Sequence, residues 1–529
     1  MIWLVLALAL GIRLLLTLSH DGYLGVDGGA YLLSYNTVLG NEPTGAGFPR
    51  PPLAPGWLLV PFVETLGVDV GYKVWSALAS LAPVVPVYLF SRRIGVLPSI
   101  FAAGFILLDL NHAEMIVTGA LPLLAFGLLG TAWWAMSSLV ERWSWKVAGL
   151  LAACVGLIPW VNQTTAGLAL VTIPIFALAL LWYNRKSAAH QRDKSSALAP
   201  AFTSGTDPGW AALFFSPTSY RLWLPLAAGG LIALGALPWY LQVLPGTGLL
   251  HYPGRFLYLT NWADSSWWQL AIAWPLGLWM LRKGETLALR ALGVLVCLLG
   301  TLLVFMSTDE TVLNVFYRSR YLLAIPWFIG ITWVVFTRWL PMFRENLIPH
   351  WVPVTATALA VGAMLFGYQW MFHRQAQYSD MATPSNAEAL AFIQRTDPGA
   401  GVVNNSFTLA LWISALNKVP SPHTWTWTPP AAWTETDKDV RCLLGWVPEC
   451  KPIEAKARLG VGYVLIDSRF PYYNKRAPGI YGAPNVAEPW ANLSEVAWLE
   501  PVFRQGTTTL WRINLYKPAQ EAQYVPTLP

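Results

Sequence analysis

Long apolar runs, broken by short polar segments, dominate the first 372 residues of the chain. A helix that crosses the hydrocarbon core of a membrane needs about 20 predominantly apolar residues. The runs predict eleven such helices, near residues 2–18, 71–91, 94–110, 116–138, 147–161, 164–183, 222–243, 266–281, 287–306, 321–337 and 351–372. The first run has no basic leader and no A-x-A cleavage site between its end and His20, which predicts a retained helix rather than a signal peptide.

Two longer segments break this apolar pattern. The segment 19–70 carries the Pro-rich stretch 51–55 and predicts two helices along the membrane surface, at 27–39 and 53–66. The tail 375–529 is long enough for one compact domain.

The tail has a mixed pattern that predicts an α/β domain. Ser385 followed by Glu388 three residues later indicates a capping box at a helix start. Strand-like runs occur at 400–404, 461–467 and 508–515. We therefore expect a polytopic α-helical membrane protein, with about eleven transmembrane helices in residues 1–374 and a C-terminal α/β domain in 375–529.

Composition agrees with the membrane assignment. Hydrophobic residues make up 55% of the chain and charged residues 12%, whereas a soluble domain is about 25% charged. This excludes a soluble enzyme, a disordered chain and a collagen-like repeat. The net charge of +6 does not call for a nucleic-acid partner, because cytoplasmic loops of membrane proteins are basic.

The Lys and Arg distribution predicts the orientation. With the N-terminus inside, the cytoplasmic loops hold fourteen basic residues: Arg92, Arg93, Arg142, Lys146, Arg185, Lys186, Arg192, Lys194, Arg221, Arg282, Lys283, Arg290, Arg338 and Arg344. The external loops between the helices hold five: Arg50, Lys73, Arg255, Arg318 and Arg320. Basic loops stay inside, so the tail and the acid-rich loops are predicted to be extracytoplasmic, in an integral protein of the inner or plasma membrane.

Asp27 is the first candidate for chemistry. It lies in a Gly-flanked turn after the first apolar run, in the sequence Gly25-Val-Asp-Gly-Gly-Ala-Tyr31. A carboxylate at the membrane boundary can accept a proton from an attacking hydroxyl. The same residue would also serve as a helix N-cap, and the sequence leaves both interpretations open.

The second external loop carries three ionisable side chains within six residues: Asp109, His112 and Glu114. They could bind a metal or orient a substrate, although their spacing matches no standard ligand motif. The alternative is a solvated turn.

Arginines in external loops are candidates for phosphate binding, because a guanidinium group binds phosphate oxygens bidentately. Arg318 and Arg320 precede the tenth predicted helix, and Arg255 closes the sequence His251-Tyr-Pro-Gly-Arg255. The alternatives are ion pairs with nearby carboxylates or contacts with lipid headgroups; the carboxylates are Asp264, Asp309 and Glu310.

The four cysteines fall into two pairs. Cys154 and Cys297 lie in apolar runs, whereas Cys442 and Cys450 lie close together in the polar tail. We predict a disulfide between the latter two, which implies an oxidising compartment. Two free thiols are the alternative.

The order of several motifs resembles the GT-C superfamily of integral-membrane glycosyltransferases. Asp27-x-x-x-Tyr31 is followed by Gly40-Asn-Glu-Pro43, Arg50-Pro-Pro-Leu-Ala-Pro55, an acidic second loop, and Arg320-Tyr-Leu-Leu-x-x-Pro326. Within this superfamily, the chain resembles most the bacterial transferases related to protein O-mannosyltransferases and the lipid A aminoarabinose transferase. The resemblance covers most of residues 1–330.

The resemblance implies transfer of a sugar from a polyprenyl-phosphate donor to a hydroxyl of a glycan, lipid or protein acceptor, at an external cavity. It assigns the catalytic base to Asp27, the second-loop acid to Glu114 or Asp109, and the donor-phosphate ligand to Arg320. Gly28 stands where the family has a second acidic residue. The other substrate-binding candidates are Tyr31, Arg50, His112, Tyr252, Arg255 and Arg318. No cofactor is assigned, and a divalent metal stays open.

Two other classes of protein compete with an enzyme. A transporter or a flippase of lipid-linked sugars would use the same number of helices, and a scaffold would bind envelope partners through the tail. Against transport stand the absence of an internal repeat and the scarcity of charge within the apolar runs, where Arg13 is the exception.

Overall fold

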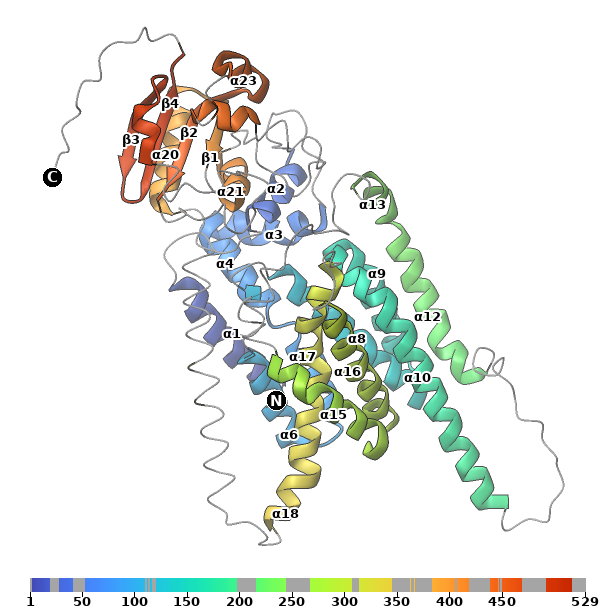
Figure 1. Cartoon of the computed structure of the whole chain (residues 1–529). Helices are drawn as coiled ribbons and strands as arrows, with labels where there is room; N and C mark the ends of the chain where they lie inside the picture. Colours follow the sequence, from blue (N-terminus) through green and yellow to red (C-terminus); the bar gives the residue numbers. More distant parts are fainter. Residues whose placement is uncertain are drawn as a thin grey trace. The chain divides into compact units, whose positions relative to one another are not determined.

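The computed structural model describes most helices and strands of the chain (Figure 1). The described residues are 2–19, 28–40, 53–109, 112, 115–116, 120–196, 216–243, 267–306, 314–344, 362, 366, 383–404, 407–417, 438–445, 447, 450–468 and 491–515. They fall into two compact units. The first holds the described parts of 1–20, 62–244 and 249–379, and the second those of 21–61 and 380–529.

The first unit is entirely helical in its described part. Its elements are α1 (Ile2–Leu18), α4 (Val68–Ala79), α5 (Val84–Ser91), α6 (Val96–Leu107), α8 (Leu121–Glu141), α9 (Trp145–Val161), α10 (Gln163–Ser196), α12 (Pro217–Leu234), α13 (Leu237–Val243), α15 (Trp267–Lys283), α16 (Leu287–Met306), α17 (Asn314–Val334), the π-helical turn η1 (Val335–Trp339) and α18 (Leu340–Arg344). Every apolar run predicted up to residue 337 coincides with one of these helices or with two consecutive ones. The run 351–372 lies outside the described residues, apart from 362 and 366.

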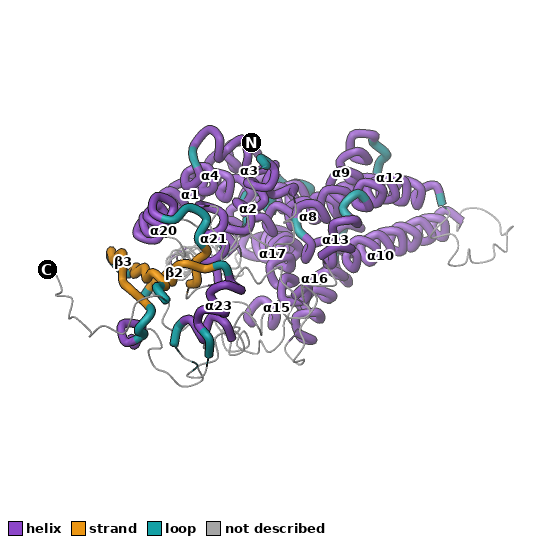
Figure 2. Tube along the Cα trace, turned by 90° about the horizontal axis from the view of Figure 1, so that it is seen from above, coloured by secondary structure: helices purple, strands orange, loops and turns teal. Residues whose placement is uncertain are grey.

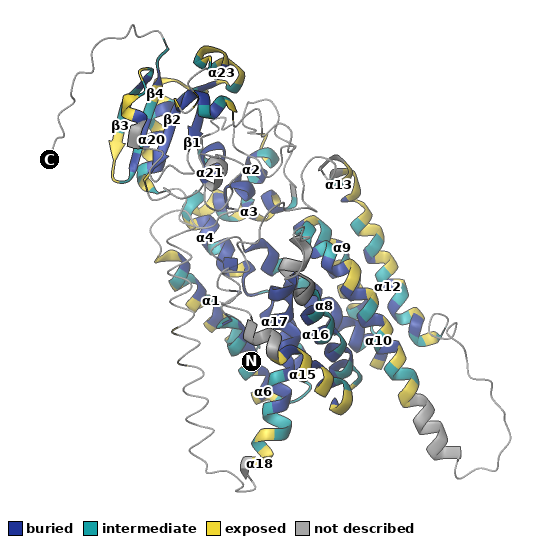
Figure 3. Ribbon diagram, viewed as in Figure 1, coloured by how far each residue is buried: buried dark blue, intermediate teal, exposed yellow. Residues whose placement is uncertain are grey.

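Four helical segments are long and apolar enough to cross a membrane, judged by length and composition within the described residues: Val68–Ser91, Leu121–Glu141, Gln163–Ser187 and Ser319–Met342. Several other apolar helices are shorter. Large apolar side chains are also exposed, such as those of Trp3 and Leu15 on α1. Figure 3 shows exposed residues in yellow along this helix. A hydrocarbon solvent tolerates such a surface and water does not, so the chain is an integral membrane protein.

Helix α8 is buried along most of its length in the first unit. Phe126 and Trp133 are fully buried, and Gly127 touches the backbone of Ala82, in the turn between α4 and α5, so closely that a Cβ atom would clash. A glycine is therefore required where these helices approach.

The second unit contains a four-stranded sheet with the order β1-β2-β4-β3. Its elements are α2 (Gly28–Val38), the start of α3 (Leu53–Leu66), α20 (Pro384–Thr396), β1 (Gly401–Asn404), α21 (Phe407–Asn417), α23 (Pro452–Leu459), β2 (Val461–Asp467), η3 (Ala491–Glu495), β3 (Leu499–Gln505) and β4 (Thr508–Ile513). Strands β1 and β2 are parallel, and the other two pairings are antiparallel. The three predicted strand runs coincide with β1, β2 and β4. Strand β3 was not predicted, because Pro501 and its charged residues obscure the alternation.

The predicted capping box of α20 was wrong by two residues. Thr383 is the N-cap: its Oγ1 accepts from the Asn386 backbone at 3.2 Å, and Asn386 Oδ1 accepts from the Thr383 backbone at 2.9 Å. Pro384 explains the shift, since a proline favours the first helical position and places the cap directly before it. Ser385 and Glu388 therefore lie inside the helix.

Two helices of the segment 19–70 pack within the second unit. The backbone N–H of Gly56 in α3 donates to Ser34 Oγ in α2 at 2.9 Å, and Asn36 Nδ2 in α2 donates to the carbonyl of Ala415 in α21 at 2.7 Å. Figure 2 shows α2 and α21 side by side. The second unit thus combines segments that the sequence boundary near 374 assigns to different regions.

Candidate functional site

The first unit contains a buried polar cluster. Its residues come from α1, from α17 and from the loop that follows α6. Arg13 enters it because residues 9, 13 and 17 of α1 form one face at helical spacing, and Ala9, Arg13 and Thr17 are the buried residues of that helix. Arg13 is 1% exposed, and its Nη2 donates to the Leu107 carbonyl at the end of α6 at 2.7 Å. The first helix therefore presents a cation to the protein interior.

Asp109 and His112 lie next to this cation. The Asp109 carboxylate accepts a hydrogen bond from the His112 backbone N–H at 3.2 Å, as a turn-forming aspartate does. Its negative charge acts on Arg13. Both Asp109 and His112 are buried, so the second loop enters the interior at this point and is not a solvated turn there.

His112 connects the loop to α17. Its Nε2 lies 3.2 Å from the backbone carbonyl oxygen of Tyr321. A carbonyl can only accept, so Nε2 carries the proton. Burial lowers the pKa of His112 to about 3, and the positive charge of Arg13 acts in the same direction. The imidazole is therefore a neutral hydrogen-bond donor.

Arg320 lies beside Tyr321 on α17. Its Nη2 donates to the Tyr321 hydroxyl, and its guanidinium carbon lies 4.4 Å from the centre of the same ring. The ring of Tyr321 in turn stacks on Phe126 of α8, with ring centres 6.4 Å apart. Arg320 is 5% exposed. The guanidinium group is thus held in one place by a ring that is itself packed.

This arrangement suits an anion. The described side chains of the cluster include two cations, Arg13 and Arg320, and the carboxylate of Asp109 interacts electrostatically with Arg13. A fixed guanidinium in a partly desolvated site binds phosphate oxygens by charge-assisted, planar hydrogen bonds. Chemically, the cluster can hold a phosphate group and stabilise negative charge that develops on it.

The structure brings together three of the predicted site residues, Asp109, His112 and Arg320. Tyr31 is buried on α2 in the second unit. The remaining candidates lie outside the described residues: Asp27, Arg50, Glu114, Tyr252 and Arg255, together with the side chain of Arg318.

Two members of the cluster were not predicted as site residues, Arg13 and Tyr321. The sequence does carry a signal for Arg13, because an ionisable side chain inside an apolar run marks a functional or structural requirement. Tyr321 has no such signal, since an aromatic residue at a helix face is usual in a membrane protein.

The described residues do not fit a divalent metal. Among them, no group of three or more His, Cys, Asp and Glu side chains is placed to hold a metal ion. His112 Nε2 carries a proton toward a carbonyl, and Asp109 lies beside the positive charge of Arg13. A metal ligand needs an available lone pair, so we derive no chemical step through a metal.

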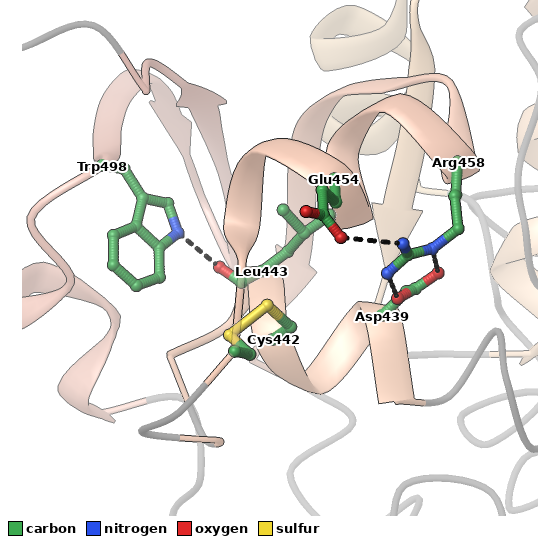
Figure 4. Close-up of a disulfide and its surroundings, with 7 residues drawn as sticks. Asp439, Cys442, Leu443, Glu454, Arg458 and Trp498 are labelled. Carbon is green, nitrogen blue, oxygen red and sulfur yellow. Dashed lines mark hydrogen bonds and ion pairs between the residues drawn. A yellow bond between two sulfur atoms is a disulfide. The ribbon is translucent and has the colours of Figure 1, made fainter.

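A disulfide joins Cys442 and Cys450 in the second unit, with Cα atoms 5.5 Å apart (Figure 4). Cys442 is part of the apolar core, with Val440, Leu443 and Leu444 as neighbours in the chain. The indole N–H of Trp498 donates to the Leu443 carbonyl at 2.9 Å. The disulfide therefore fixes Cys450 to Cys442, which belongs to the apolar core of the second unit.

Comparison with known proteins identifies the fold. No protein-family model matches the sequence, and no curated protein matches it. The oligosaccharyltransferase of Archaeoglobus fulgidus in its apo form is similar in structure, with a TM-score of 0.56 and 14% identity over 89% of this chain and 70% of that one. The oligosaccharyltransferase AglB from Archaeoglobus fulgidus, in complex with an inhibitory peptide and a dolichol-phosphate, has a TM-score of 0.54 and 14% identity over 97% of this chain and 75% of that one.

ArnT from Cupriavidus metallidurans in the apo state is similar along its whole length. Its TM-score is 0.54 at 14% identity, and the match covers 97% of both chains. AglB and ArnT are GT-C membrane glycosyltransferases, and this chain shares their fold. The resemblance that the order of motifs indicates is confirmed at the level of the fold.

Proposed function

We propose that the protein is a membrane glycosyltransferase that moves a sugar from a polyprenyl-phosphate donor to an acceptor hydroxyl. The observation that carries the proposal is the Arg320 guanidinium, which is buried and held beside the ring of Tyr321. A buried guanidinium group held in one position binds a phosphate group by planar, charge-assisted hydrogen bonds. The GT-C fold supplies the class of reaction.

The chemistry needs few parts. A lipid phosphate is a good leaving group, so the reaction requires a base for the acceptor hydroxyl and cations for the departing phosphate. Arg320 takes the second role, with Arg13 adding positive charge at the same cluster. His112 holds the Tyr321 backbone and so the position of Arg320.

Asp27 takes the role of the base. It precedes α2, and a carboxylate that is partly desolvated becomes more basic. Direct attack of the deprotonated hydroxyl on the anomeric carbon inverts its configuration. The second-loop acid is assigned to Glu114, since the described contacts of Asp109 are those of a turn residue paired electrostatically with Arg13.

The reaction is placed on the extracytoplasmic face. The fourteen-to-five distribution of Lys and Arg supports this orientation, and a disulfide in the second unit is typical of an oxidising compartment. The AglB structure contains a dolichol-phosphate, which supports a polyprenyl-phosphate carrier here. The acceptor is a glycan, a lipid or a protein of the cell envelope.

Purified protein in detergent, given a polyprenyl-phosphate-linked radiolabelled sugar, tests the proposal. Release of the lipid phosphate together with transfer or hydrolysis of the sugar supports an enzyme, and Asp27→Asn should lower the rate of transfer by roughly 10²–10⁴-fold. Movement of the intact lipid-linked sugar across reconstituted vesicles without cleavage would instead identify a flippase. Neither cleavage nor movement, across a panel of pentose and hexose donors, would contradict both assignments.

A further inference from the structure

A second group of cations lies far along the chain from the proposed active site, around the turn between α15 and α16. This basic cluster consists of Arg282 and Lys283 at the end of α15, Arg290 in the first turn of α16, and Lys186 on α10. The side chains of Arg282, Lys283 and Lys186 are exposed. The turn is short, so α15 and α16 return antiparallel to each other.

Arg290 connects the three helices. Its Nε donates to the Gly284 carbonyl at the end of α15 at 2.8 Å, and its guanidinium carbon lies 5.8 Å from the ring centre of Tyr183 on α10. Lys186 follows Tyr183 by one helical turn, and its ammonium lies 5.0 Å from the ring of Trp182. The stretch of α10 around Tyr183 and Lys186 therefore lies at the level of the turn between α15 and α16.

The described residues do not neutralise this cluster. No carboxylate among them lies within ion-pair distance of Lys186, Arg282, Lys283 or Arg290, and Glu285 pairs with Arg338 at 3.5 Å instead. Capping of the α15 carbonyl occupies only the Nε of Arg290. Its two Nη groups retain the planar fork that suits a phosphate.

Position in the membrane decides which anion fits. Trp182 and Tyr183 are aromatic residues of the type that lies at headgroup level, and Arg290 follows them on the adjacent helix. Apolar side chains are exposed on the same helices toward the membrane centre, including Leu178 on α10 and Leu278 and Trp279 on α15. A cationic headgroup site above an apolar exposed surface matches an amphiphile with a phosphate head and acyl chains.

We propose that the basic cluster binds the phosphate of an anionic phospholipid, at the membrane face opposite to the proposed active site. Arg290 is the fixed ligand, and Lys186, Arg282 and Lys283 contribute attraction at the surface. An anionic lipid surface attracts each Lys or Arg by about 1 kcal/mol, equivalent to about fivefold in affinity. The proposal depends on the membrane class of the protein and not on its catalytic activity.

Lipid titrations on the full-length protein in detergent test the site. Native mass spectrometry and the thermal midpoint are followed while phosphatidylglycerol or phosphatidylcholine is added. We expect phosphatidylglycerol to bind and raise the midpoint, and phosphatidylcholine to do neither. Arg290→Gln keeps an amide donor for the Gly284 carbonyl but removes the charge, so binding should weaken about fivefold or more, and Lys283→Gln should act in the same direction.

Arg142→Gln is the matched control, because Arg142 is an exposed arginine at the end of α8, on the face that the charge distribution also places inside. It should leave lipid binding unchanged. Equal losses in Arg142→Gln and Arg290→Gln would overturn the site in favour of unspecific charge attraction. Equal stabilisation by soluble glycerol phosphate would also overturn it, because a free anion would then suffice.

Discussion

His112 Nε2 lies 3.2 Å from the carbonyl oxygen of Tyr321, a residue 209 positions away in the chain. The contact ties the loop after α6 to α17 at the residue next to Arg320. Hydrogen bonds therefore connect Asp109, His112, Tyr321 and Arg320, so we expect a change at His112 to reach Arg320 through its neighbour Tyr321.

His112 should make stability depend on pH. The pKa of the folded imidazole is about 3, below the usual value of about 6.5 for an exposed histidine. Between these values the unfolded chain binds a proton that the folded chain does not, so stability falls as pH decreases through this window. The limiting slope is roughly 1.4 kcal/mol per pH unit.

Thermal midpoints in detergent from pH 7.5 to 4.5 measure this effect for the wild type, His112→Gln and His112→Ala. Glutamine offers an N–H donor near the position of Nε2 and does not titrate, so it should keep most of the stability at pH 7 and flatten the slope. Alanine should lose stability at all pH values. An equal slope in His112→Gln would assign the pH dependence to other groups.

Arg320→Lys should weaken binding of the lipid-phosphate donor by roughly tenfold or more. Lysine keeps the charge but loses the planar fork, and a hydrogen bond to a charged group contributes about 1.5–3 kcal/mol. Donor affinity can be measured by quenching of tryptophan fluorescence with a polyprenyl phosphate. Arg338→Lys is the control, because Arg338 is on the same continuous helical segment but pairs with Glu285; an unchanged affinity in Arg320→Lys would remove this residue from the site.

Asp27→Asn separates the two roles of this residue. Asparagine caps a helix as well as aspartate does but cannot accept the proton of an acceptor hydroxyl. Transfer should therefore fall by roughly 10²–10⁴-fold, while expression and thermal midpoint stay close to the wild type. Near-normal transfer would leave Asp27 as a cap and move the base to another acidic residue, either Asp21, six residues before it in the chain, or Asp109 or Glu114 of the second loop.

The Cys442–Cys450 bond should stabilise the second unit by about 2–3 kcal/mol, as expected for a loop of this length. Peptide mass spectrometry without reduction should detect the linked peptide. Replacing both cysteines by alanine should lower the thermal midpoint, whereas replacing Cys154 should leave the linked peptide intact. Alkylation of both thiols in the native protein would refute the bond in solution.

A reporter fused after residue 529 tests the orientation. An enzyme that matures only outside the cytoplasm, such as alkaline phosphatase, should be active there, because the basic loops are predicted to stay inside. The same reporter fused after Arg142 should be inactive. Activity of the fusion after Arg142 and inactivity of the fusion after residue 529 would contradict the predicted orientation and place the second unit on the cytoplasmic side.

The sequence by itself determined the local structure of this protein. A membrane helix is predicted from the length of an apolar run alone, and α1, α8 and α16 lie within a few residues of the predicted runs. A short, largely apolar run predicts a buried strand in the same way, as β2 shows, since all of its residues except Gly462 are buried. The cap of α20 was predicted two residues too late, because Pro384 was not recognised as the first helical residue. The information needed for the correct prediction was present in the local sequence.

Only the tertiary structure decided which polar groups meet. Arg13 reaches the Leu107 carbonyl across 94 residues, and Asn36 reaches the Ala415 carbonyl across 379. No spacing in the sequence encodes such contacts, because they depend on how whole helices pack and which face each turns inward. The buried charge of Arg13 was visible as an exception in its helix, but its partners were fixed by packing. The same packing converted the loop histidine His112, one of several candidates by sequence, into a neutral donor that holds α17.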